Sequence, residues 1–317
     1  MEDPRGGPIE TAPAKRTGRT VLAVTAAPPP APAAAPSPSG LSAPVTIRTL
    51  QRCRERGERF ACLTCYDATT ARWLERAGVP VLLVGDTAAE VILGLPGTIH
   101  APLEFLVTIT AAVKRGAPLA MVLGDMPFLS YQVDEASAIR NAGRFLTAGL
   151  ADAVKLEADR SFAPLVAKMA RAGIAVVGHI GSRPQQTKLR GGYLSTGRTA
   201  KEARGLLDDA RALEDAGASM LLIEAVPAEV SERIVARAGV PVIGCGAGPA
   251  CHGQVVVLQD ILGLSDWQPA FAQPLANASS TLTEAAAAWV GRVQRNELGP
   301  HPYRMSAEEL AALDRGT

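Results

Sequence analysis

Two aliphatic runs of the chain each end in a Gly-Asp pair. The first, VPVLLVGDT, covers residues 79–87, and the second, PLAMVLGD, covers residues 118–125, so Asp86 and Asp125 close the two runs. Carboxylate oxygens are the ligands that hard cations such as Mg²⁺ prefer in proteins. The first question is therefore which elements would bring these two carboxylates to one place.

Other ionisable residues end similar runs downstream. Lys155 and Glu157 lie in ADAVKLEA, His179 lies in IAVVGHIG, and Glu224 lies in ASMLLIEAV. Lys155 and Glu157 are two positions apart, so on a strand they point to the same side. The first and last runs add a smaller polar set, namely Thr64, Tyr66, Asp67 and Asp260.

The spacing of these runs predicts the fold. Helical segments with apolar residues at i, i+3 and i+4 separate the runs, and several end in Ala-Gly, a common helix stop. The runs are nearly continuous Val, Ile and Leu, as in a parallel sheet covered by helices. We therefore predict an α/β protein with a single (β/α)8 TIM barrel and a disordered N-terminal extension. The expected strands are 60–67, 79–86, 118–125, 151–158, 174–181, 218–226, 240–248 and 254–263.

A doubly wound open sheet is the alternative fold. It is disfavoured because no G-x-G-x-x-G follows the first strand, and GCGAGP comes far too late in the chain.

The two ends of the chain differ from its middle. Residues 28–44 include seven prolines, and such a segment cannot bury enough apolar surface to order itself. We expect a disordered Pro/Ala-rich extension at 1–44, the catalytic barrel at 45–300 and a C-terminal helical tail at 301–317. The short apolar stretch 21–27 leaves export as a minor alternative to the cytoplasm.

Composition excludes several classes of protein. The net charge is +1 with no basic cluster, which argues against nucleic-acid binding. No apolar run approaches the roughly 20 residues of a membrane span. Five cysteines do not suggest a disulfide framework. Cys62 and Cys65 form a C-x-x-C, but on a strand they face opposite sides, so we expect two buried residues rather than a zinc or redox site.

A metal site is the first chemical hypothesis. In a (β/α)8 barrel the active site lies at the carboxyl ends of the strands. Asp86, Asp125 and Glu157 come from three successive strands, and a Mg²⁺ ion would offset their mutual repulsion. Taken singly, each acid could instead cap a helix or pair with an arginine. Lys155 would neutralise charge or bind a substrate carboxylate, or form a structural ion pair with Glu157 or Asp125.

A general base is the second hypothesis. Glu224 follows an apolar run, and an apolar setting raises a carboxyl pKa into the range of a useful base. The alternative is a buried acid that accepts hydrogen bonds from the backbone. His179 would polarise a substrate oxygen or be a satisfied core histidine. A metal that chelates a 2-oxo acid acidifies the neighbouring C–H, and a base opposite then generates an enolate.

These residues and their surroundings resemble a known family. From about Val45 to at least Gly263 the chain resembles ketopantoate hydroxymethyltransferases (3-methyl-2-oxobutanoate hydroxymethyltransferases), which belong to the phosphoenolpyruvate/pyruvate superfamily of barrels. The matching motifs are TCYDATTARWLERAGV, LLVGDT, AAVKRGAP, GDMPFLSY, AVKLE, GHIG, RGGY, LLIEAVP and IGCGAGPACHGQVVVLQD.

The resemblance implies roles for the individual residues. Mg²⁺ would be held by Asp86, Asp125 and Glu157, and Glu224 would remove the C3 proton of the 2-oxo acid. The substrate would contact Asp86, Thr87, Asp125, Lys155 and His179. The implied carbon donor is methylene-tetrahydrofolate, the pathway is pantothenate synthesis, and the protein would be a cytoplasmic homo-oligomer.

The chain departs from the family pattern in several loops. Ala158-Asp159 replaces a usual Gly-Gly, Ser182-Arg183 precedes the Pro-Gln that follows GHIG, and Ala101-Pro102 replaces a usual Val-Thr. His252 replaces a usual aspartate, and the family's closing motif is only loosely echoed near His301. An extra arginine could pair with a second carboxylate or phosphate on a different acid, or these changes could be ordinary loop drift.

Three other functions stay open at this point. The first is a hydroxymethyltransferase or aldolase of the same lineage that acts on another 2-oxo acid. The second is a phosphoenolpyruvate-class lyase or mutase, although the mobile loop with a nucleophile or acid that such enzymes carry is not evident, because Cys245 and Cys251 lie at the seventh strand. The third is a barrel retained as a binding protein, which the complete acid set disfavours.

Overall fold

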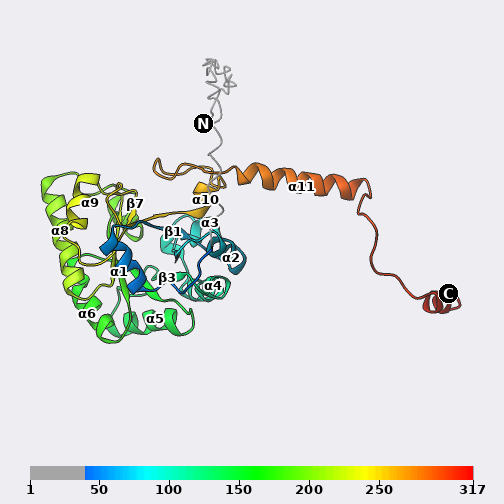
Figure 1. Cartoon of the computed structure of the whole chain (residues 1–317), viewed down its shortest axis with the longest axis horizontal. Helices are drawn as coiled ribbons and strands as arrows, with labels where there is room; N and C mark the ends of the chain where they lie inside the picture. Colours follow the sequence, from blue (N-terminus) through cyan, green and yellow to red (C-terminus); the bar gives the residue numbers. More distant parts are fainter. Residues whose placement is uncertain (1–39, 317) are drawn as a thin grey trace, which may run out of the picture. The chain divides into compact units, whose positions relative to one another are not determined.

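A closed barrel of parallel strands forms the centre of the protein, as expected (Figure 1). The computed structural model describes residues 40–316, and within this range eight strands pair in sequence order, with β8 closing against β1. The fold is therefore a (β/α)8 TIM barrel. Its strands are β1 (Phe60–Thr64), β2 (Val81–Val84), β3 (Met121–Asp125), β4 (Ala153–Glu157), β5 (Val176–Gly181), β6 (Met220–Glu224), β7 (Val242–Cys245) and β8 (Gly253–Val256).

Most helices before α11 lie around the barrel, and several begin at a side-chain cap. Asp67, Asp134 and Thr199 each accept hydrogen bonds from backbone N–H groups in the first turn of the helix that follows. Among the described helices, none is both long and apolar enough to cross a bilayer. The helices are α1 (Ile47–Arg56), α2 (Ala68–Arg76), α3 (Ala88–Val91), α4 (Leu103–Gly116), α5 (Glu135–Thr147), α6 (Ala163–Arg171), α7 (Thr187–Arg190), α8 (Ala200–Asp215), α9 (Ala228–Val235), α10 (Leu258–Ile261), α11 (Ala278–Gln294) and α12 (Ala307–Asp314).

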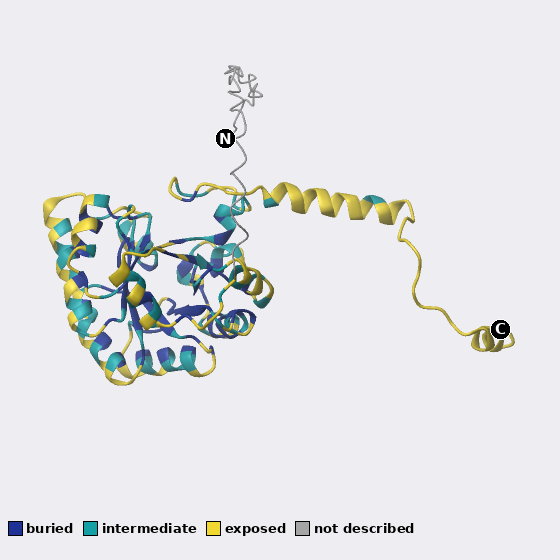
Figure 2. Ribbon diagram, viewed as in Figure 1, coloured by how far each residue is buried: buried dark blue, intermediate teal, exposed yellow. Residues whose placement is uncertain are grey.

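Successive strand residues alternate between two apolar cores. Cys62, Leu83 and Leu123 belong to the cluster inside the barrel, whereas Cys65 and Leu82 belong to the larger layer between strands and helices. In Figure 2 the strands are accordingly dark at the centre, and the outer faces of the helices are exposed. The two cysteines of the C-x-x-C thus lie in different cores, and all five thiols are free. This confirms that they form no disulfide framework.

A glycine in the second Gly-Asp pair permits helix packing. A Cβ atom on Gly124 would lie 2.4 Å from the ring of Phe145, which belongs to α5. Any larger residue would push α5 away from β3, because packed interiors leave no room for an extra methyl group. Gly124 therefore lets β3 carry Asp125 to the end of the barrel while α5 packs directly behind it.

Residues near the start of the described chain close the amino end of the barrel. Val45 and Leu50 are buried in the interior cluster, and the Val45 N–H donates to the carbonyl of Leu119. Leu41 also packs against both cores. Leu41 belongs to residues 40–44, the part of the expected extension that the structure describes. The rest of that prediction concerns residues outside the described range.

The last expected strand is shorter than predicted. Strand β8 ends at Val256, and Leu258–Ile261 forms the short helix α10. The Leu258 N–H donates to the side-chain oxygen of Thr64 instead of a strand partner, which diverts the chain out of the sheet. Asp260 consequently lies on a helix rather than at a strand end.

Candidate active site

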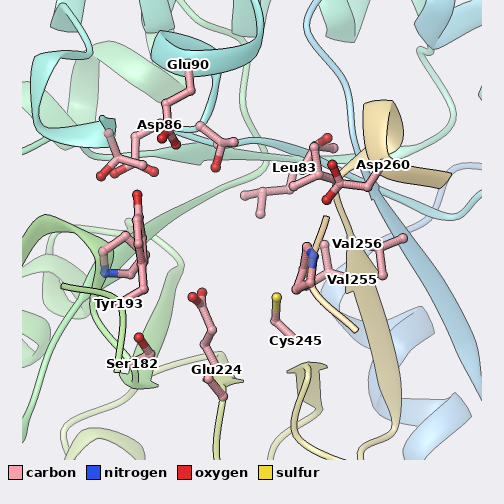
Figure 3. Close-up of a pocket in the computed structure, with 18 of the residues that line it drawn as sticks. Leu83, Asp86, Glu90, Ser182, Tyr193, Glu224, Cys245, Val255, Val256 and Asp260 are labelled. Atoms are coloured by element: carbon pink, nitrogen blue, oxygen red, sulfur yellow. The ribbon is translucent and has the colours of Figure 1, made fainter. Parts of the chain in front are cut away.

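One cavity at the carboxyl ends of the strands gathers the predicted site residues. Its volume is about 810 Å³, within the usual range for ligand pockets. On several strands, every second residue faces the barrel interior, and the last of these residues is polar and lines the cavity. Examples are Ala153, Lys155 and Glu157 of β4, and Leu222 and Glu224 of β6. The predicted residues that line it are Asp86, Thr87, Asp125, Lys155, Glu157, His179 and Glu224 (Figure 3).

A buried ion pair forms the floor of the pocket. Lys155 Nζ lies 2.7 Å from Asp125 Oδ1, and Asp125 Oδ2 accepts a hydrogen bond from the backbone N–H of Asp86. Burial raises the pKa of Asp125 to about 7, although the ammonium of Lys155 opposes this shift. Burial lowers the pKa of Lys155, but the surrounding carboxylates outweigh it, so the net shift is upward and Lys155 stays a cation at neutral pH. The alternative of a structural pair with Asp125 is thus observed.

Gln185 connects the other two predicted metal ligands. Its side-chain Nε2 donates to Asp86 Oδ2 at 2.9 Å, and its backbone N–H donates to the carboxylate of Glu157. The hydroxyl of Tyr131 lies 3.0 Å from Gln185 Oε1 and accepts from the Glu157 N–H. Burial raises the pKa of Glu157 to about 9. Sequence reasoning missed Gln185 as a positioning residue, although it stands in the Pro-Gln that follows GHIG.

The chemistry of this acid set suits a hard cation. Three buried carboxylates, Asp86, Asp125 and Glu157, face a single buried ammonium, and burial raises the pKa of Asp125 and of Glu157. Within residues 40–316, however, no three acidic, histidine or cysteine side chains are placed to ligate one ion by themselves. The donors therefore fit a Mg²⁺ ion held by one or two carboxylates with water and substrate oxygens. The assignment of all three as direct ligands stays a prediction.

Glu224 and His179 lie together on another side of the cavity. Nε2 of His179 is 3.3 Å from Oε2 of Glu224, but neither ring nitrogen has an aligned hydrogen-bond partner among the described residues. Burial and the charge of Lys155 lower the pKa of His179, so its imidazole is neutral at pH 7. About 22% of the Glu224 side chain is exposed, so the carboxylate reaches the cavity rather than lying sealed in an apolar core. His179 therefore lies beside a carboxylate of the cavity, and its contact with a substrate oxygen stays a prediction.

Two further residues in the cavity were not singled out from the sequence. Glu90 of α3 and Tyr193 line the same side as Asp86 (Figure 3). Burial and the nearby Asp86 raise the pKa of Glu90, and a hydrogen bond with the hydroxyl of Tyr193 opposes this shift only in part. The sequence does contain signals for both residues, because Glu90 follows Asp86 by one helical turn and Tyr193 belongs to the RGGY motif. Thr87 also lines the cavity, and its side chain makes no capping hydrogen bond to α3.

Two departures from the family pattern pair with each other. Nη1 of Arg183 donates to Oδ2 of Asp159 at 2.7 Å, and neither residue lines the cavity. The extra arginine is thus neutralised by the extra aspartate. His252 is also structural, because its Nδ1 accepts from the Val242 N–H, and Asp67 caps α2 instead of entering the cavity.

Several solved structures have the same fold. A phosphonopyruvate hydrolase solved with oxalate and Mg²⁺ has a TM-score of 0.55 and 13% identity over 85% of this chain and 95% of its own. A 2,3-dimethylmalate lyase, described as a PEP mutase/isocitrate lyase superfamily member, has a TM-score of 0.53 and 17% identity over 85% of this chain and 95% of its own. At these identities the likeness shows the fold alone.

Sequence relatives are much closer. A 3-methyl-2-oxobutanoate hydroxymethyltransferase of Ignicoccus hospitalis is 42% identical over 259 residues, which cover 82% of this chain and 98% of the relative. A second 3-methyl-2-oxobutanoate hydroxymethyltransferase, from Chloroflexus aurantiacus, is 44% identical over 271 residues, which cover 84% of this chain and 96% of the relative. The family described as ketopantoate hydroxymethyltransferase matches residues 44–300. The chain is therefore an enzyme of the ketopantoate hydroxymethyltransferase family.

Proposed function

We propose that this enzyme transfers a hydroxymethyl group from methylene-tetrahydrofolate to 3-methyl-2-oxobutanoate, giving 2-dehydropantoate with the help of Mg²⁺. The observation that carries the proposal is one cavity that holds three carboxylates around Lys155 and, on another side, Glu224 beside a neutral His179. The names of the relatives support the substrate and the reaction.

The residues divide the work between binding and proton transfer. One or two of Asp86, Asp125 and Glu157 would hold Mg²⁺, which supplies Lewis acidity to the carboxylate and ketone oxygens of the bound acid. Lys155 keeps Asp125 in place and adds positive charge where negative charge develops on the substrate. Glu224 takes the C3 proton, and His179 beside it contacts a substrate oxygen.

The overall reaction balances with one water molecule. The C3–H bond breaks with its proton passing to Glu224, and a new bond forms between C3 and the one-carbon unit. Both bonds between that carbon and the carrier nitrogens break, and these nitrogens take up the proton held by Glu224 and one proton of the water. Tetrahydrofolate then leaves, and the rest of the water provides the new hydroxyl group.

Proton exchange tests this proposal before any folate is added. The protein is incubated with Mg²⁺ and 3-methyl-2-oxobutanoate in D₂O, and loss of the C3 proton is followed by NMR, with Glu224→Gln as the control. Exchange that needs both Mg²⁺ and Glu224 supports the enolate mechanism. Absence of exchange while Mg²⁺ still binds would mean that the cavity takes a different acid or that the reaction is of the lyase or mutase class.

We further propose that the enzyme is a cytoplasmic homo-oligomer. Helix α11 supports assembly, because it has no buried residue and exposes Leu282, Trp289 and Val293. Apolar side chains gathered on one element commonly mark a contact surface. Light scattering after size-exclusion chromatography measures the assembly, and a purely monomeric enzyme at micromolar concentration would contradict it.

A further inference from the structure

One side of the cavity is lined by large apolar residues beside a few polar ones. The segment after α10 contributes Leu264, Trp267, Pro269 and Phe271 to the lining, together with Ser265 and Asp266. Trp267 is 77% exposed and Phe271 is 48% exposed, so large apolar surfaces stand at the mouth of the cavity without cover. The proton-transfer chemistry proposed above uses none of these residues.

The segment is attached to the barrel at defined points. The backbone N–H groups of Leu275 and Ala276 both donate to the carbonyl of Ile261 in α10. The ring of Phe271 lies against Gly246 directly after β7, where a Cβ atom would lie 2.5 Å from the ring. Gly246 has a φ of +60°, which also favours glycine. Phe271 therefore packs directly on the end of β7.

Two hydrogen-bond acceptors line the cavity beside these aromatic residues. The side-chain Oε1 of Gln259 is buried and has no partner within residues 40–316. The carboxylate of Asp260 accepts a hydrogen bond from Ser265. In Figure 3 Asp260 lies opposite Asp86 and Tyr193, with Glu224 and Cys245 between the two sides. A buried acceptor without a donor costs free energy unless a ligand supplies the donor.

The cavity has room for a second molecule beside the 2-oxo acid. A five-carbon 2-oxo acid has eight non-hydrogen atoms, and at the roughly 30 Å³ that a water molecule occupies it needs at most about 240 Å³. The cavity measures about 810 Å³. More than half of it is left for another ligand, whose reacting carbon has to approach the side of the cavity that holds Glu224.

We propose that Trp267 and Phe271, together with Gln259 and Asp260, form the subsite for the pteridine ring of the one-carbon carrier. This proposal rests on the proposed function. A pteridine is a flat heterocycle that stacks on aromatic side chains, and its amino and ring N–H groups need acceptors such as Gln259 Oε1 and the Asp260 carboxylate. With the ring at the exposed rim, the longer tail of the carrier extends into solvent.

Trp267→Ala tests the subsite, with Trp73→Ala on α2 as the matched control. Trp73 is also exposed, at 61%, but does not line the cavity. We expect Trp267→Ala to raise KM for methylene-tetrahydrofolate about tenfold, in the range of one lost stacking contact. KM for the 2-oxo acid and the folate-free proton exchange should stay as in the wild type, and Trp73→Ala should change none of these quantities. An unchanged KM for the carrier, or an equal loss of proton exchange, would overturn the subsite.

A binding experiment separates this proposal from the proposed function. The chain has three tryptophans, so replacing Trp73 and Trp289 by phenylalanine leaves Trp267 as the only one. Titration with tetrahydrofolate should quench its fluorescence, and adding Gln259→Leu should weaken the binding. Quenching in a protein without proton exchange would uphold the subsite and reject the proposed acid substrate. Absence of quenching in an exchange-competent protein would reject the subsite alone.

Discussion

The two sides of the cavity are built on different principles. The charged side is carried by β2 to β5 and is closed to water, with Asp125 only 1% exposed and held by Lys155 and the Asp86 N–H. The aromatic side is carried by α10 and the segment after it, and Trp267 is 77% exposed there. Charges that must be fixed within a fraction of an ångström lie on strands, whereas a surface that receives a large flat ligand lies on a connection.

This difference has an energetic cause. Buried carboxylates are tolerated only where neighbouring groups compensate them, so each one needs partners on several strands. An exposed tryptophan needs no such partners and tolerates a less constrained backbone. Substitutions on the charged side should therefore affect folding and chemistry together, whereas those on the aromatic side should affect one substrate only.

The largest effect is expected for Glu224→Gln. Loss of the base should slow both C3 proton exchange and overall turnover by about 10³-fold, near the upper part of the range for general bases. Mg²⁺ affinity, measured by calorimetry, should stay within about threefold of the wild type, because Glu224 lies apart from the carboxylates around Lys155. Exchange at the wild-type rate would transfer the role of base to another residue.

Asp125→Asn should affect both stability and metal dependence. It should abolish Mg²⁺-dependent activity and leave Lys155 without its closest partner, lowering the free energy of unfolding by about 3 kcal/mol. The double variant Asp125→Asn/Lys155→Met should unfold less easily than Asp125→Asn alone while remaining inactive. Urea denaturation gives the stabilities, and full activity in Asp125→Asn would remove this residue from the metal site.

The charged side should also make stability depend on pH. The pKa values of Asp125 and Glu157 are raised to about 7 and about 9, so the folded protein binds these protons more tightly than the unfolded chain. The free energy of unfolding should therefore fall as the pH rises from 7 to 9 without metal. Mg²⁺ competes with these protons, so its affinity should rise over the same range.

Thermal unfolding and calorimetry at pH 7, 8 and 9 measure both trends. Glu157→Gln provides the control, because it removes the group with the higher pKa and should flatten both curves above pH 8. A Mg²⁺ affinity that does not change between pH 7 and 9 would show that these carboxylates are already ionised in the metal-free protein.

The smallest effect is expected for the Asp159–Arg183 pair. Arg183→Ala should destabilise the enzyme by about 1 kcal/mol, because the pair is partly exposed. Its turnover of 3-methyl-2-oxobutanoate should stay within about threefold of the wild type, since neither residue lines the cavity. A panel of 2-oxo acids checks this prediction, and a changed order of preference in Arg183→Ala would restore a specificity role for the pair.

The fold and the charged side could be predicted because their signals are local. Each strand is a short aliphatic run, and the inward alternation carries Asp125, Lys155, Glu157, His179 and Glu224 to the same end of the barrel. Once parallel strands are recognised, no further information is needed to place these residues together. The mutual pairing of Arg183 with Asp159 was not predictable, because it depends on two loops that are separate in the sequence.

The remaining misses also depend on contacts between distant segments. Strand β8 ends early because Thr64 takes the Leu258 N–H, a contact between residues almost two hundred positions apart. Gln185 acquires its role by reaching both Asp86 and Glu157. Trp267 lies in a segment with no regular periodicity, and only its place at the cavity mouth indicates a use.

The depth at which the charged residues lie has a kinetic consequence. The carboxylates and Lys155 form the closed floor of the cavity, whereas Trp267 and Phe271 stand at its mouth. If the carrier covers that mouth, the 2-oxo acid has to bind before the carrier does. The product then has to leave after tetrahydrofolate has left. Initial-rate patterns should then follow a compulsory order, and a large excess of carrier should inhibit the enzyme by blocking access of the acid.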